Sequence, residues 1–140
     1  MFIMKLVRIL VASVAVTVFN VVVGGLTCGW LFNWVYKIEP TNVWKPMEGP
    51  PGVVFLAGSL ALSLILVLVY VLLRKGIPGP NRLVKGLVFG LCVWAVGVLP
   101  GMLSTFTFMT VAATVLIYWT ALLLVVLPLK GLIIAAIYGK

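Results

Sequence analysis

Residues 53–73 read VVFLAGSLALSLILVLVYVLL, and this stretch decides the fold class. It contains no charged side chain, and it matches the roughly 20 residues that an α-helix needs to cross the hydrocarbon core of a bilayer. A transmembrane β-strand would instead alternate apolar and polar residues over about ten positions. Because the run from 60 to 69 is almost continuously apolar, the sequence predicts a membrane-spanning helix and disfavours a barrel.

The rest of the chain has the same character. It has 140 residues, of which 64% are hydrophobic and 9% are charged, whereas about 25% of the residues in a soluble domain are charged. Further apolar stretches at about 9–36, 86–103 and 110–129 complete an all-α, four-helix integral membrane bundle. We therefore expect a single transmembrane domain over residues 1–140, with connections at 37–52 and 74–85 and an apolar tail at 131–139.

The basic residues predict the orientation of the bundle. Ten Lys and Arg face two acidic residues, and positive charge is concentrated in cytoplasmic loops. Most of them fall on one side of a four-span chain, namely Lys5, Arg8, Arg74, Lys75, Arg82, Lys85, Lys130 and Lys140. Only Lys37 and Lys45 fall on the other side, in the loop that also carries Glu39 and Glu48. The pattern predicts cytoplasmic termini and an outer 37–52 loop.

The cations flank apolar spans and do not form a basic face, so we expect contacts with membrane lipids and none with nucleic acid. Positive residues beside a span attract anionic headgroups. The candidates for this contact are Arg74, Lys75, Arg82 and Lys85.

Glycines recur at four-residue steps in two of the predicted helices. Inside lipid, helices associate through small residues and interhelical hydrogen bonds. The candidate packing positions are Gly25 and Gly29 in the first helix and Gly86, Gly90, Gly97 and Gly101 in the third. These faces could pack within the monomer or against another subunit or a second copy.

Three polar or amphipathic side chains fall inside the predicted spans. Asn20 is costly to expose to lipid, so we expect it to bond another helix, with Ser59 or Ser63 as the proposed partner. Trp94 and Trp119 fall near the middle of their spans, although membrane tryptophans favour the interfaces. They either fill the bundle core or wall a pocket for a hydrophobic ligand.

The position of Lys130 in the sequence is compatible with two registers of the fourth helix relative to the membrane. In the first, Lys130 marks the cytoplasmic interface, and the tail 131–139 extends the helix, lies on the surface or docks to a partner. In the second, the helix slides so that Lys130 sits inside the membrane, where an ionisable residue is a functional candidate. We expect the first register, because a lysine near a helix end reaches the interface easily.

Several kinds of chemistry lack their usual residues. The chain has no histidine, which is the commonest metal ligand and general base, and its two cysteines, Cys28 and Cys92, are far apart in sequence. We therefore expect no metal, no cofactor, no catalytic residues and no enzymatic activity. None of the predicted spans contains a carboxylate, unlike the small multidrug resistance transporters, which depend on a membrane-embedded Glu.

The segment KGLVFGLCVW at 85–94, followed by Pro100 and by Ile137-Tyr138-Gly139, is similar to small bacterial four-helix membrane proteins of uncharacterised function. Those proteins have a Gly-rich third helix of GLxFGLxxW type and a Gly/Tyr-containing last helix. The resemblance covers the second half of the chain. It implies a four-helix fold in a bacterial inner (plasma) membrane and implies no activity.

Two functions fit these observations. The first is a structural or accessory subunit of a larger membrane complex, packing through its glycine faces. The second is a small membrane protein, or transporter, that binds lipid or another hydrophobic molecule through Trp94 and Trp119.

Overall fold

The computed structural model describes residues 1–46 and 52–139, and this part of the chain is all-helical. Four helical stretches in it are long and apolar enough to cross a membrane, namely Phe2–Leu31, Val53–Leu73, Arg82–Phe108 and Ala113–Tyr138. The predicted class, an all-α bundle with four such helices, is confirmed. The predictions made for Glu48 and Lys140 lie outside the described residues.

The first span begins earlier than expected. Helix α1 covers Phe2–Leu26, continues as the π-helical η1 (Thr27–Leu31), and is followed by the 3₁₀ helix η2 (Asn33–Lys37). The expected start at residue 9 excluded Lys5 and Arg8 because they are charged. Lys and Arg are good helix formers, so the two residues lie within the helix instead of preceding it.

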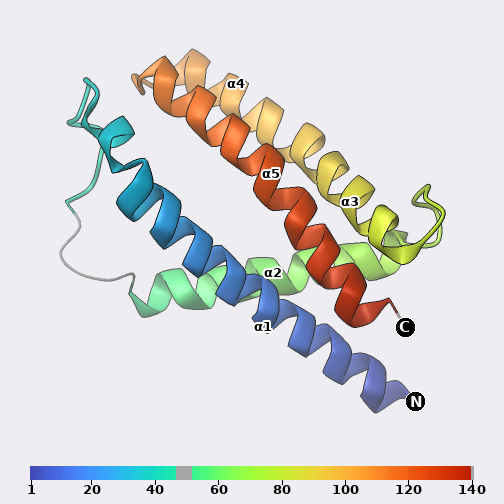
Figure 1. The fold of residues 1–140 in the computed structure, drawn as a ribbon. Helices are drawn as coiled ribbons and strands as arrows, with labels where there is room; N and C mark the ends of the chain where they lie inside the picture. The colour runs from blue at the N-terminus through green and yellow to red at the C-terminus, as the bar shows by residue number, and fades with distance from the viewer. Residues whose placement is uncertain (47–51, 140) are drawn as a thin grey trace.

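The second span, α2, covers Val53–Leu73 and has the predicted bounds. It crosses the other helices obliquely and packs chiefly against α1 (Figure 1). The connection that follows contains Gly79, whose φ of 154° favours glycine.

The third span is longer than the predicted 86–103. It consists of α3 (Arg82–Val93), the π-helical η3 (Trp94–Val98) and α4 (Leu99–Phe108). It begins at Arg82 because the Asn81 side chain caps the helix, accepting a 3.0 Å bond from the Val84 N–H. The helix widens into a π-turn at Trp94–Val98, just before Pro100. Such π-turns and prolines are the usual causes of bends in helices.

The last helix, α5, covers Ala113–Tyr138 and therefore runs past the expected end at Leu129. Pro128 lies inside the helix without ending it. The tail thus extends the helix, which is one of the three arrangements considered for it. The predicted helix end at Leu129 is wrong, because Lys130 lies within α5. The register of α5 relative to the membrane stays a prediction.

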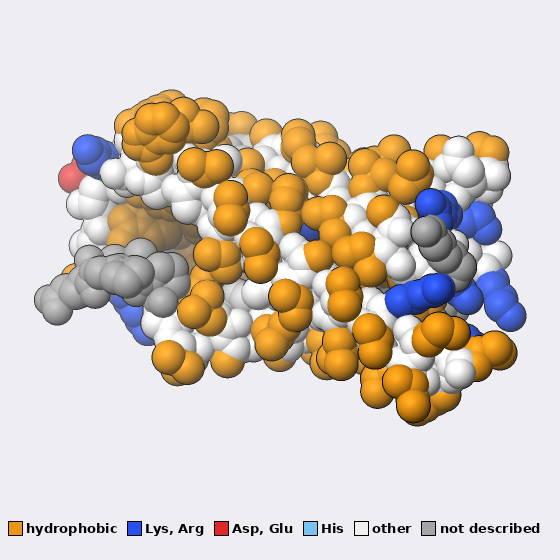
Figure 2. Space-filling model, turned by 60° about the horizontal axis from the view of Figure 1, so that its bottom comes forward, with side chains coloured by type: hydrophobic (Ala, Val, Ile, Leu, Met, Phe, Trp, Pro, Cys, Tyr) orange, Lys and Arg blue, Asp and Glu red, His pale blue; other side chains and the backbone are white. Residues whose placement is uncertain are grey.

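The elongated molecule has two distinct ends. Both termini and the 74–81 connection lie at one end, here called the terminal end; the residues after α1 and the 109–112 connection lie at the other, here called the loop end (Figure 1). Figure 2 shows Lys and Arg at both ends of the face in view, with apolar side chains spread along it between them. This distribution is that of a multi-pass membrane protein.

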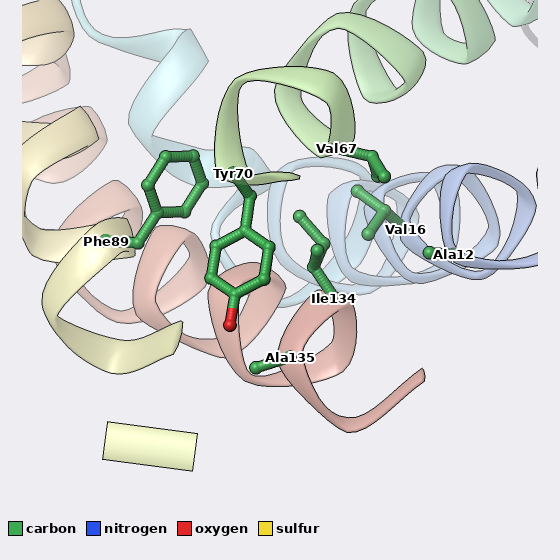
Figure 3. Packing of buried hydrophobic residues seen from close by; sticks show 7 residues of the cluster. All are labelled: Ala12, Val16, Val67, Tyr70, Phe89, Ile134 and Ala135. Atoms are coloured by element: carbon green, nitrogen blue, oxygen red, sulfur yellow. The ribbon is translucent and has the colours of Figure 1, made fainter. Parts of the chain in front are cut away.

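The core lies where all four spans meet, toward the terminal end. Helix α5 packs chiefly against α3 and also against α1. Figure 3 shows the central cluster, in which the Tyr70 and Phe89 rings meet edge to face with centroids 5.2 Å apart. The cluster comprises Ala12, Val16, Val67, Tyr70, Phe89, Ile134 and Ala135.

Candidate functional site

A polar pair joins α1 to α5 inside the bundle. The Lys130 ammonium donates a 2.6 Å hydrogen bond to Asn20 Oδ1, and both side chains are half-buried. Asn20 therefore bonds another helix, but the proposed partners Ser59 and Ser63 on α2 are not the ones it uses. The sequence could not reveal this pairing, because it depends on the antiparallel packing of two helices 110 residues apart.

The hydroxyls beside Asn20 on α1 are satisfied within their own helix. Ser13 Oγ donates to the Ile9 carbonyl at 2.8 Å, and Thr17 Oγ1 donates to the Ser13 carbonyl at 2.8 Å. Such back-bonding leaves no hydroxyl proton for a neighbouring group. The Asn20 amide is thus the polar group on this face of α1 that reaches across to α5.

Trp119 belongs to an aromatic cluster at the loop end, near the start of α5 and not at its middle as expected. Its indole N–H donates a 2.7 Å hydrogen bond to the Tyr36 hydroxyl. Tyr36 and Trp44 pack edge to face at 5.1 Å, and Trp44 and Trp119 do so at 5.9 Å. Burial raises the pKa of the Tyr36 phenol above its ordinary value.

The rings meet edge to face or tilted and fill the space between them, so the aromatic cluster is a packed element and not an open cage. Its members are Phe32, Tyr36, Trp44, Tyr118 and Trp119. The Trp44 indole nitrogen is buried without a hydrogen-bond partner among the residues that the structure describes.

Trp94 is not a member of the aromatic cluster. Its indole N–H donates a 3.0 Å hydrogen bond to the Thr120 carbonyl and so ties the third span to α5. It also lines an apolar groove of about 560 Å³ between η3–α4 and α5. Trp119 does not line this groove, so the groove does not bring Trp94 and Trp119 together.

The closest approach of α3 to α5 occurs at glycines. A Cβ atom at Gly86 would lie 2.7 Å from the Ala135 Cβ and still nearer the Gly131 carbonyl oxygen. A Cβ at Gly90 would overlap the backbone at Leu127 and Pro128. These positions let two backbones touch, and Gly131 is a third member of the contact that the four-residue spacing did not reveal.

The other four candidate glycines make no such contact. A Cβ added at Gly25, Gly29, Gly97 or Gly101 would meet nothing within 4 Å in the described part of the chain. The third-helix glycines share a face in an ideal helix, but the π-turn at 94–98 rotates the residues after it. A packing role within the monomer is therefore wrong for these four positions.

The predicted headgroup residues gather at the terminal end around the last turn of α5. The Arg74 guanidinium lies 4.9 Å from the centre of the Tyr138 ring. Lys85 Nζ donates a 3.4 Å bond to the Arg74 carbonyl, and Lys75 is exposed. A Cβ at Gly139 would meet Arg82 Cδ at 2.9 Å. Binding of lipid headgroups by these residues stays a prediction.

No protein-family model, characterised protein or solved structure matches this chain. The resemblance to small bacterial membrane proteins therefore stays a prediction. Among the residues that the structure describes, no three His, Cys, Asp or Glu side chains lie together as a metal site would require. The most unusual feature is the Lys130–Asn20 pair.

Proposed function

We propose that this protein is a structural or accessory subunit of a larger membrane complex, in the plasma membrane of a prokaryote and with its termini in the cytoplasm. The observation that carries the proposal is that its helices leave two apolar grooves open at the side. One lies between α1 and α2, and the other between η3–α4 and α5.

Both grooves suit an apolar occupant. Their polar side chains are few, and the hydroxyls among them are turned to their own helices: Thr17 Oγ1 bonds the Ser13 carbonyl, and Thr120 Oγ1 bonds the Leu116 carbonyl. The Trp94 N–H is also already used. A polar substrate would find no free donor among these side chains, which favours packing over catalysis or carriage of polar solutes.

The test is to extract the protein from its natural membrane into native nanodiscs and to weigh the particles by native mass spectrometry. We expect a defined assembly with other subunits in fixed ratio. A protein that runs as a monomer and copurifies with nothing would overturn the proposal.

A matched pair of variants locates the contact. Ala121→Phe places a ring in the groove beside α5, and we expect it to weaken the assembly. Val96→Phe adds the same ring at a position that is 78% exposed and outside the groove, and we expect the assembly to persist.

The second candidate is a membrane protein that binds a lipid or another hydrophobic molecule. The groove lined by Trp94 favours it, because an acyl chain fits an open apolar channel as well as a helix does. A monomer or homo-oligomer that carries one specific lipid-like mass, lost in the Ala121→Phe variant, would support this alternative against the first.

A further inference from the structure

The Lys130–Asn20 pair lies far from the charged ends of the helices. Tyr138, which the Arg74 guanidinium covers, comes eight residues after Lys130. At 1.5 Å per residue, Lys130 is therefore about 12 Å along α5 from the level of the basic residues at the terminal end. Asn20 is similarly about 18 Å along α1 from Arg8. Both residues are thus at membrane depth.

The Lys130 side chain points away from the terminal end. Side chains on a helix point toward its N-terminus, and the N-terminus of α5 lies at the loop end (Figure 1). The 2.6 Å bond to Asn20 shows that the ammonium is held within the bundle. Lys130 therefore does not extend to the nearer headgroup layer.

The charge of Lys130 is not balanced within the described part of the chain. The carboxylate found there is that of Glu39, which lies in the loop after α1 and bonds the Thr41 backbone N–H at 3.1 Å. An ammonium has three N–H donors, and the Asn20 oxygen accepts one of them. A cation at membrane depth costs several kcal/mol unless it is paired.

We propose that Lys130 and Asn20 form a binding site, inside the membrane, for a carboxylate on a transmembrane helix of a partner protein. The ammonium supplies the charge and two donors, and the Asn20 amide holds it in place while its own NH₂ remains available as a donor. An Asp or Glu on a helix can be placed at any depth, whereas a lipid headgroup would have to descend about 12 Å into hydrocarbon to reach this site.

This inference rests on the proposed function, because it names how the subunit would recognise its partner. Both residues are partly exposed, so the pair is not fully enclosed by the bundle. Apolar packing alone gives little orientation between helices in lipid, so a charge pair would fix the register of the partner helix.

The probe is a synthetic Leu-rich transmembrane helix with one central Glu, and the control probe carries Gln there. The full-length protein and the probe are labelled and placed in phosphatidylcholine vesicles, and their association is followed by resonance energy transfer. We expect the Glu helix to associate with the wild type at least about tenfold more tightly than with Lys130→Met, which corresponds to about 1.4 kcal/mol.

Matched variants separate charge from folding. We expect Lys130→Arg, which keeps the cation, to retain association, and Lys5→Met, which removes an exposed lysine near the N-terminus, to leave it unchanged. Equal association of the Glu helix with Lys130→Met, or no preference for the Glu over the Gln helix with the wild type, would overturn the proposal. Binding of oleate that depends on Lys130, without binding of the Glu helix, would overturn it in favour of an amphiphile.

The native assembly distinguishes this inference from the proposed function. If the assembly from natural membranes forms equally with wild type and Lys130→Met, the carboxylate site is wrong while the subunit proposal stands. If the wild type is recovered alone, the subunit proposal fails whatever the synthetic helix does.

Discussion

The Lys130 ammonium and the Asn20 amide oxygen, 2.6 Å apart, connect the last helix to the first across the bundle. Each group lowers the cost of burying the other in lipid, because the amide oxygen accepts a hydrogen bond from the ammonium. The pair therefore contributes to the fold whether or not a partner binds it.

Replacing Asn20 by Leu should destabilise the protein, because Lys130 would remain half-buried without its acceptor. The expected loss in the free energy of unfolding is about 1–3 kcal/mol, measured by reversible unfolding in mixed detergent. Lys130→Met removes the stranded charge, so the double variant should be less destabilised than the sum of the single variants. Strict additivity would show that the two side chains do not interact.

Adding a methyl group at Gly131 or Gly90 should force α3 and α5 apart, because the Cβ would overlap backbone atoms of the opposing helix. Gly131→Ala should lower stability by about 1–3 kcal/mol, as other overpacked sites do. Gly25→Ala is the control: its Cβ would meet nothing, and Ala favours a helix over Gly by up to about 1 kcal/mol. Thermal unfolding in detergent measures both, and an equal effect of the two changes would contradict the contact.

Trp94→Phe should weaken the link between the third span and α5, because it removes the indole N–H that donates to the Thr120 carbonyl. The expected cost is about 0.5–1.5 kcal/mol. Trp30→Phe makes the same chemical change at a side chain that is 73% exposed and should have no measurable effect. Equal midpoints of chemical unfolding for the two variants would rule out a structural role of the Trp94 bond.

Single cysteines should report opposite sides of the membrane at the two ends of the bundle. In a chain whose Cys28 and Cys92 are replaced by Ala, we expect Lys75→Cys to react with an impermeant maleimide only after the cells are opened. Thr41→Cys should react in intact cells, because the basic residues are concentrated at the other end. The reverse pattern would invert the proposed orientation, and reaction of both in intact cells would contradict the four-span topology.

The helix positions were largely predictable because hydropathy is a local property. The bounds of α2 agree with the prediction, since charged or Gly/Pro residues flank it on both sides. The predicted bounds of the other spans were too narrow wherever a charged residue was taken to mark the end of a helix. Lys5, Arg82 and Lys130 all lie within helices, because Lys and Arg are good helix formers.

The candidate site was only partly predictable. Asn20 was identified because its polarity stands out in an apolar span, and Gly86 and Gly90 because of their spacing. Their partners, Lys130 and Gly131, and the separation of Trp94 from Trp119 depend on which faces of the helices meet. The buried face of α5 is hard to predict from its sequence, because this helix is apolar on nearly every side.

The sequence by itself thus determined a membrane protein of four apolar helices, since the transfer of each segment into lipid depends on that segment alone. Only the tertiary structure decided that Lys130 reaches Asn20 on another helix and that Gly131 faces Gly86. In lipid every apolar face is equally well solvated, so helix pairing is decided by close contacts and hydrogen bonds between residues distant in the chain.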